Sequence, residues 1–164
     1  MSDDEATSPT RKARLNLLLR KQQGTAKRTR LQQILQPLPS GSWRLISLAE
    51  SDILSESLLN TIRAARDDER LIRKGELTTS EFEAELTRLL TFRHEDEQLL
   101  VSLSDVSQVG LIEITVSALR DTASKLIEHD RDSMITTSRE FNWGVIAQRL
   151  EKSERISYQI EAWG

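Results

Sequence analysis

The chain has 164 residues, and none of them is cysteine, which excludes disulfides and metal sites built on thiolates. Its net charge of −3 is divided unevenly: residues 1–42 hold 8 Lys/Arg and 3 Asp/Glu, whereas residues 43–164 hold 15 Lys/Arg and 23 Asp/Glu. The acidic, polar start does not resemble a secretory signal, and no apolar run is long enough to span a membrane. We therefore expect a cytoplasmic protein without membrane contact.

The first 42 residues predict a basic N-terminal arm that is partly helical or flexible. Residues 1–9 indicate a flexible tail, and Thr10 can cap a helix over residues 11–23 that carries Leu15, Leu18 and Leu19. A second helix over 25–36 ends where two prolines, Pro37 and Pro39, interrupt helical hydrogen bonding. The Pro/Gly/Ser-rich segment 37–42 then predicts a boundary.

Residues 43–164 predict one acidic α+β domain, and its first half is mainly helical. Residues 43–48 favour a strand, and a long helix is expected to start at Ser51 or Asp52 and to include Ile72. Lys74 followed by Gly75 is typical of a helix end. Thr78 and Glu81 form a capping-box pattern that should start the next helix.

The second half predicts hairpins. Residues 99–103 and 112–116 alternate with period two around a turn at 104–110. Ser117 is expected to cap a helix, a strand should follow at 134–137, and residues 143–147 and 156–160 favour a last hairpin. We therefore expect a mainly antiparallel sheet of five to six strands, covered on one face by about three helices.

One set of residues suggests an enzyme. Asp105 lies near the first predicted hairpin, Glu113 lies on its second strand, and Lys125 lies on the next helix. Over residues 81–130 this order resembles the restriction-nuclease-like family, in which two carboxylates hold Mg²⁺ and a lysine assists the attacking water. The family's strand lysine is absent after Glu113, so Lys125 would have to replace it. The alternative is structural, with Asp105 in a turn and Glu113 on the solvent face.

Metal, cofactor and nucleophile motifs are otherwise weak. His94 stands beside three carboxylates, but their spacing matches no common ligand set. The glycines are scattered singly, so no phosphate-binding loop is expected. Neither His94 nor His129 lies near a nucleophile elbow. We expect no cofactor and no resident metal.

The acidic clusters favour a binding function instead. An acidic face steers a basic partner by charge, and we expect such a face, with one aromatic contact, to bind a protein: Asp67, Asp68, Glu69, Glu95, Asp96, Glu97 and Trp163. Trp163 is expected to be the most exposed tryptophan. Size, charge and α+β pattern resemble the small bacterial immunity proteins that neutralise toxins. The sequence therefore predicts a non-enzymatic inhibitor of a basic toxin or nuclease, with a Mg²⁺-dependent nuclease or an adaptor subunit as alternatives.

The basic arm leaves its own alternatives. It could contact nucleic acid through phosphates, fold onto the acidic domain, or dock on a partner. Residues 1–42 contain no aromatic side chain, so few residues there could stack on bases and any binding of nucleic acid would be electrostatic and unspecific. Nucleic acid is therefore a possible partner of the arm but is not favoured. Membrane binding is not expected, because aromatic anchors are missing.

Overall fold

The computed structural model describes residues 9–164, so the flexible tail predicted for residues 1–9 lies outside them except at Pro9. The described chain forms six helices and seven strands. In chain order these are α1 (Pro9–Gln23), α2 (Thr25–Leu35), β1 (Trp43–Leu45), α3 (Leu48–Asp67), β2 (Ile72–Leu77), α4 (Thr79–Thr91), β3 (Gln98–Leu103), α5 (Val106–Val109), β4 (Ile112–Thr115), α6 (Val116–Asp130), β5 (Ser133–Ser138), β6 (Gly144–Lys152) and β7 (Arg155–Trp163).

All seven strands form one sheet in the order β1-β4-β3-β5-β6-β7-β2, and every pairing is antiparallel. The α+β class, the antiparallel sheet and the two arm helices are therefore confirmed. The expected counts are wrong: the sheet has more than five to six strands, and there are more than three helices in addition to those of the arm. The short helix α5 lies where a turn was expected.

The missed strand is β2. The long helix ends at Asp67, before the predicted position, and Glu69 turns the chain with a φ of 55°. Lys74 and Gly75, expected to end the helix, lie inside β2. This strand is at the sheet edge and almost all of its side chains are exposed, so it lacks the apolar alternation by which strands are recognised.

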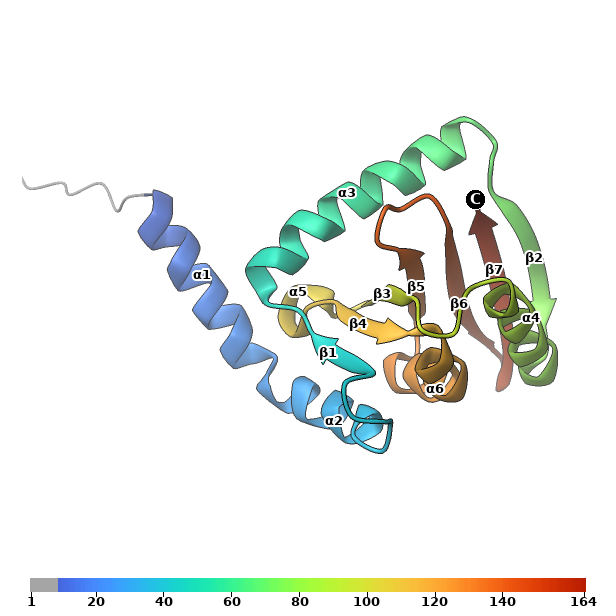
Figure 1. Ribbon diagram of the computed structural model, residues 1–164, viewed down its shortest axis with the longest axis horizontal. Coiled ribbons are helices and arrows are strands. Elements are labelled where there is room, and N and C mark those ends of the chain that lie inside the picture. The colour runs from blue at the N-terminus through green and yellow to red at the C-terminus, as the bar shows by residue number, and fades with distance from the viewer. Residues whose placement is uncertain (1–8) are drawn as a thin grey trace, which may run out of the picture.

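Helices cover both faces of the sheet, and the expectation of one covered face is wrong (Figure 1). Along β6, Val145 and Ala147 join the main core with residues of α2, α4 and α6, whereas Ile146 packs with Leu58 and Ile62 of α3. Successive strand side chains point to opposite faces, so α3 lies across the face opposite to the other three helices.

The main core also includes part of the predicted arm. Leu31 and Leu35 of α2 are fully buried against α6 and the sheet, and Phe82 stacks on Tyr158 with ring centroids 4.4 Å apart. The packing therefore crosses the boundary predicted at residue 42. By contrast, α1 stands out from the body over most of its length (Figure 1).

Polar side chains begin the body helices. Thr78 and Glu81 form the predicted capping box: the Thr78 hydroxyl accepts from the Glu81 amide, and the Glu81 carboxylate accepts from the Thr78 amide. Ser117, expected to cap α6, lies inside that helix. Thr115 caps it instead, with its hydroxyl 3.2 Å from the Ala118 amide. Val116 thus begins the helix and does not extend the strand.

The carboxylate of Glu85 gives an acid-dependent contribution to stability. It accepts hydrogen bonds from Arg88 at 2.6 Å and forms an ion pair with Lys74 of β2 at 3.0 Å, and these contacts lower the pKa of Glu85 from 4.5 to about 2. A lowered folded-state pKa stabilises the protein above the unfolded value, and this stability is lost as the pH falls from about 4.5 to about 2.

We therefore expect Glu85→Gln to destabilise the protein at neutral pH and to reduce its loss of stability between pH 5 and pH 2 (roughly the window set by the two pKa values). Urea denaturation across this range measures both effects. Glu83→Gln, two residues away in the same helix and without an ion pair among the described residues, is the control. A variant whose stability depends on pH as the parent's does would contradict the assignment.

Candidate functional site

Glu113, one of the three residues that suggest a nuclease, forms internal ion pairs. It lies on β4 between Ile112 and Ile114, which enter the main core, so its side chain points to the opposite face of the sheet. There it is buried, accepts a hydrogen bond from Arg44 at 2.8 Å and is also paired with Arg139. The two guanidinium groups satisfy its charge without a metal ion.

The other two members of the set lie elsewhere. Lys125 is exposed on α6, which packs against the face of the sheet that Glu113 does not reach. Asp105 precedes α5, where burial and the nearby charge of Asp130 raise its pKa. The three side chains are therefore not brought together. Asp105 lies in a turn, as the structural alternative predicts, but Glu113 is buried and the solvent exposure expected for it is wrong.

No group of three or more possible metal-ligating side chains occurs within residues 9–164. His94 uses its Nδ1 to accept a hydrogen bond from the Asp96 amide at 3.2 Å. This bond closes the local turn and points the ring nitrogen at the backbone.

The first acidic cluster lies at the end of α3 and is exposed. Asp67 is the last helical residue, Asp68 and Glu69 form the turn to β2, and all three side chains are on the surface. Asp68 is 3.3 Å from Arg70, and both of these side chains are more than half exposed. The turn retains a net negative charge, because Asp67 and Glu69 form no ion pair with another described residue.

The second acidic cluster is partly neutralised. Glu97 pairs with Arg93, and Glu95 lies 3.4 Å from Arg120. Asp96 is exposed and forms no ion pair within the described chain. Of the predicted acidic residues, Asp67, Glu69 and Asp96 are therefore the ones whose charge stays free for a partner.

Trp163 is buried, so the expectation that it is the most exposed tryptophan is wrong. Its side chain is buried under α3 with Leu58, Ile62 and Ile146, and its Nε1 donates to the Phe141 carbonyl at 2.9 Å. The two other tryptophans, Trp43 and Trp143, are only partly buried. Trp163 is thus a core residue and offers no surface to a partner.

The helix α1 is anchored at one end. Arg20 donates to Asp52 of α3 at 2.7 and 2.9 Å and to the Ser107 carbonyl of α5 at 2.7 Å. Next to it, a Cβ on Gly24 would lie 2.3 Å from the Gln108 carbonyl oxygen. Only glycine allows α5 to approach the α1–α2 joint this closely.

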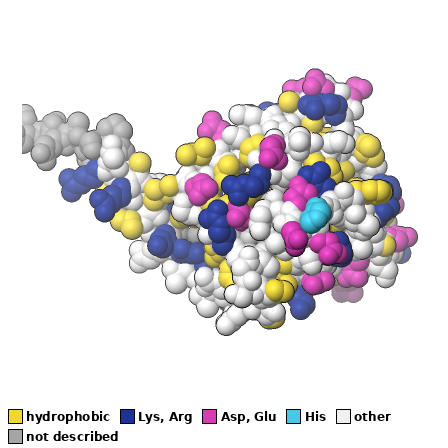
Figure 2. All heavy atoms as spheres, in the orientation of Figure 1, with side chains coloured by type: hydrophobic (Ala, Val, Ile, Leu, Met, Phe, Trp, Pro, Cys, Tyr) yellow, Lys and Arg dark blue, Asp and Glu magenta, His cyan; other side chains and the backbone are white. Residues whose placement is uncertain are grey.

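Beyond that anchor, α1 exposes apolar side chains among cations (Figure 2). Leu15, Leu18 and Leu19 are 49%, 56% and 58% exposed. Basic residues precede and follow them on this helix, with Arg14 before Leu15 and Arg20 after Leu19. Three exposed leucines in one short helix form an apolar surface of the kind that marks an interaction site.

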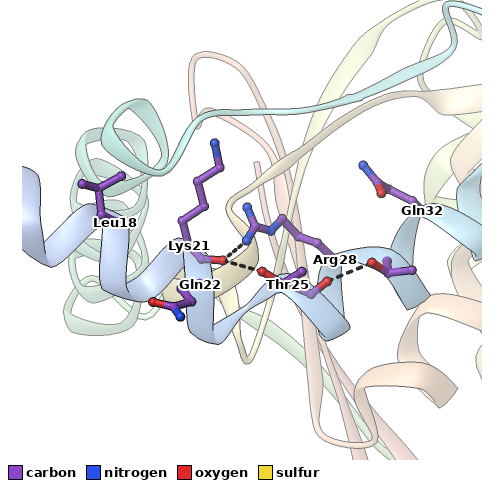
Figure 3. A pocket seen from close by; sticks show the side chains of 7 residues that line it. Leu18, Lys21, Gln22, Thr25, Arg28 and Gln32 are labelled. Atoms are coloured by element: carbon purple, nitrogen blue, oxygen red, sulfur yellow. Dashed lines mark hydrogen bonds between the residues drawn. The ribbon is translucent and has the colours of Figure 1, made fainter.

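A groove of about 500 Å³ lies between this helix and the start of α3. One wall holds Leu17 and Leu18, and the other holds Leu45, Leu48 and Ala49. Three cations also line it: Arg14, Lys21 and Arg28. In the adjoining hollow at the α1–α2 joint, Leu18, Lys21 and Arg28 point to the same side (Figure 3).

The sequence indicated the leucine stripe of α1 but neither its exposure nor this groove. The stripe of Leu15, Leu18 and Leu19 was the available signal, together with the cations around it. The second wall could not be predicted, because nothing in residues 45–49 indicates that they face a helix from the arm.

Comparisons of the chain with protein-family models, with curated proteins and with solved structures found no match. Among the described residues, no helix combines the length and apolar character needed to cross a membrane.

Proposed function

We propose that this protein is a cytoplasmic protein-binding module that acts by docking, as an immunity-type inhibitor of a basic toxin or nuclease. The observation that carries this proposal is the free negative charge of Asp67 at the exposed end of α3 and of Glu69 and Asp96 on exposed turns. Charges that are not neutralised within the chain attract a partner of opposite sign and speed its association.

The other charges of the domain also favour binding of a basic partner. Many of its basic side chains are already paired with carboxylates of the domain, as Arg93, Arg120 and Arg149 illustrate. The acidic excess of residues 43–164 is therefore left on the surface. The separation of Glu113 from Lys125 by the sheet also disfavours the nuclease alternative.

The proposal predicts a kinetic effect of charge. Asp67→Asn, Glu69→Gln and Asp96→Asn together should slow association with the basic partner about tenfold at low salt and flatten its salt dependence. The partner is first recovered from a lysate of the source cells with the parent protein as bait, and association rates are then measured by surface plasmon resonance.

A matched control carries the same charge change elsewhere: Asp121→Asn, Asp132→Asn and Glu154→Gln alter three other exposed carboxylates. The control should associate nearly as fast as the parent. Equal slowing of both variants would show that only net charge matters, and unchanged rates in both would remove the proposal.

An adaptor role is the second candidate, and the projecting helix α1 favours it. An exposed, basic, leucine-bearing helix with an adjoining groove offers a second contact to a larger assembly. In that case the protein would copurify with a stable complex and would not abolish the activity of any partner.

A further inference from the structure

We infer that the groove between α1 and the start of α3 is a docking site for an acidic amphipathic helix of another protein. The inference concerns residues distinct from the acidic turns, so it stands or fails separately from the proposed inhibitor function. It depends on two properties of the groove, its apolar walls and its unpaired cations.

The walls match the apolar face of a helix. Leu17 and Leu18 of α1 face a second wall of Leu45, Leu48 and Ala49 across the groove. Leu18 is more than half exposed, and Ala49 is exposed as well. Helices that bind in grooves place side chains at spacings of three and four residues between two such walls.

The cations of the groove favour a negatively charged partner. Within residues 9–164, Arg14, Lys21 and Arg28 form no ion pair with a carboxylate. Arg28 instead donates to the Lys21 carbonyl at the end of α1, which leaves the positive side of the groove without a counter-charge. A helix that carries carboxylates beside its apolar stripe supplies both complements.

Charge also argues against the two other occupants. The leucine stripe of α1 in a second copy is surrounded by cations, so its insertion would place like charges together. Nucleic acid would satisfy the cations but would leave the leucine walls covered by a phosphate backbone. Residues 1–42 moreover offer no aromatic side chain for base stacking.

The test uses a fluorescein-labelled peptide of about 18 residues, long enough to form a helix, with leucine on one face and glutamate and alanine on the other. Fluorescence anisotropy with the full chain should show saturable binding. A version with lysine in place of glutamate should bind at least about tenfold more weakly. In NMR spectra of labelled protein, the amide signal of Ala49 should shift on titration with the acidic peptide.

Two charge-reversed variants separate the groove from net charge. Arg14→Glu combined with Lys21→Glu changes two exposed groove residues and should weaken binding of the acidic peptide about tenfold or more. Lys12→Glu combined with Arg30→Glu makes the same charge change on α1 and α2 outside the groove. This variant should weaken binding of the peptide less than about threefold. Circular dichroism checks that both variants remain folded.

Several outcomes would overturn the inference. They are failure of the acidic peptide to bind, equal loss in both double variants, and an unshifted Ala49 signal in the presence of bound peptide. Displacement of the peptide by a short DNA duplex whose binding depends on Arg14 and Lys21 would assign the groove to nucleic acid. A dimer that is lost in Leu18→Ser would assign it to a second copy.

Discussion

Gly144→Ala is expected to destabilise the protein by about 3–5 kcal/mol, the cost typical of losing a buried tryptophan. An alanine Cβ at this position would lie 2.1 and 2.2 Å from Cη2 and Cζ2 of Trp163. The indole cannot move aside without leaving the cluster under α3 and breaking its hydrogen bond to the Phe141 carbonyl. Urea denaturation followed by tryptophan fluorescence would measure the loss.

Gly75→Ala is the matched control. A Cβ on Gly75 meets no atom within 4 Å, so the same substitution in β2 should change the free energy of unfolding by less than about 1 kcal/mol. Trp163→Leu provides the second check, because Gly144→Ala should cost less when the indole is absent. Equal costs in both backgrounds would refute the steric explanation.

Leu35→Ala is expected to cost about 2–5 kcal/mol, although it lies within the predicted arm. Leu35 is completely buried in the main core, where α2 packs against α6. Leu19→Ala is the comparison: it makes the same substitution in the neighbouring helix, at a side chain that is largely exposed. It should change stability by less than about 0.5 kcal/mol.

Chemical denaturation of both variants distinguishes an integral α2 from a detachable one. If Leu35→Ala proved as mild as Leu19→Ala, the packing of α2 on the body would be wrong. The expected result would also place the boundary between the arm and the body: α1 would be detachable, and α2 would belong to the body.

Much of the fold could be predicted because local signals agreed with burial. The capping box at Thr78 and the alternation of Leu99, Val101 and Leu103 both gave the right element, since each depends on residues close in sequence. Such patterns record which side of an element meets the core.

The errors arose where long-range packing decided the outcome. The strand β2 is defined by its pairing with β7, as in Ile72 opposite Ala162, and its exposed side chains carry no pattern of their own. Likewise, Trp163 is the last residue of β7, a position that looked peripheral, yet α3 covers it. No local feature of residues 72–77 or of Trp163 records these distant partners.

The candidate site was predicted only in part. The exposed carboxylates lie at the end of α3, in the case of Asp67, and on turns, in the case of Glu69 and Asp96. Glu113 could not be assigned in the same way, because its partners Arg44 and Arg139 come from two other segments. The groove depends on the angle between α1 and the body, which Gly24 and Arg20 set through contacts with distant residues.

The place of β7 between β6 and β2 has a consequence for synthesis. The segment that leads from α3 to α4 is made early, but its strand has no partner until residues 155–163 leave the ribosome. Loop closure over so long a stretch is slow, so the nascent chain carries an unfinished sheet margin meanwhile. The charged side chains of β2 would keep this margin from pairing with other nascent chains.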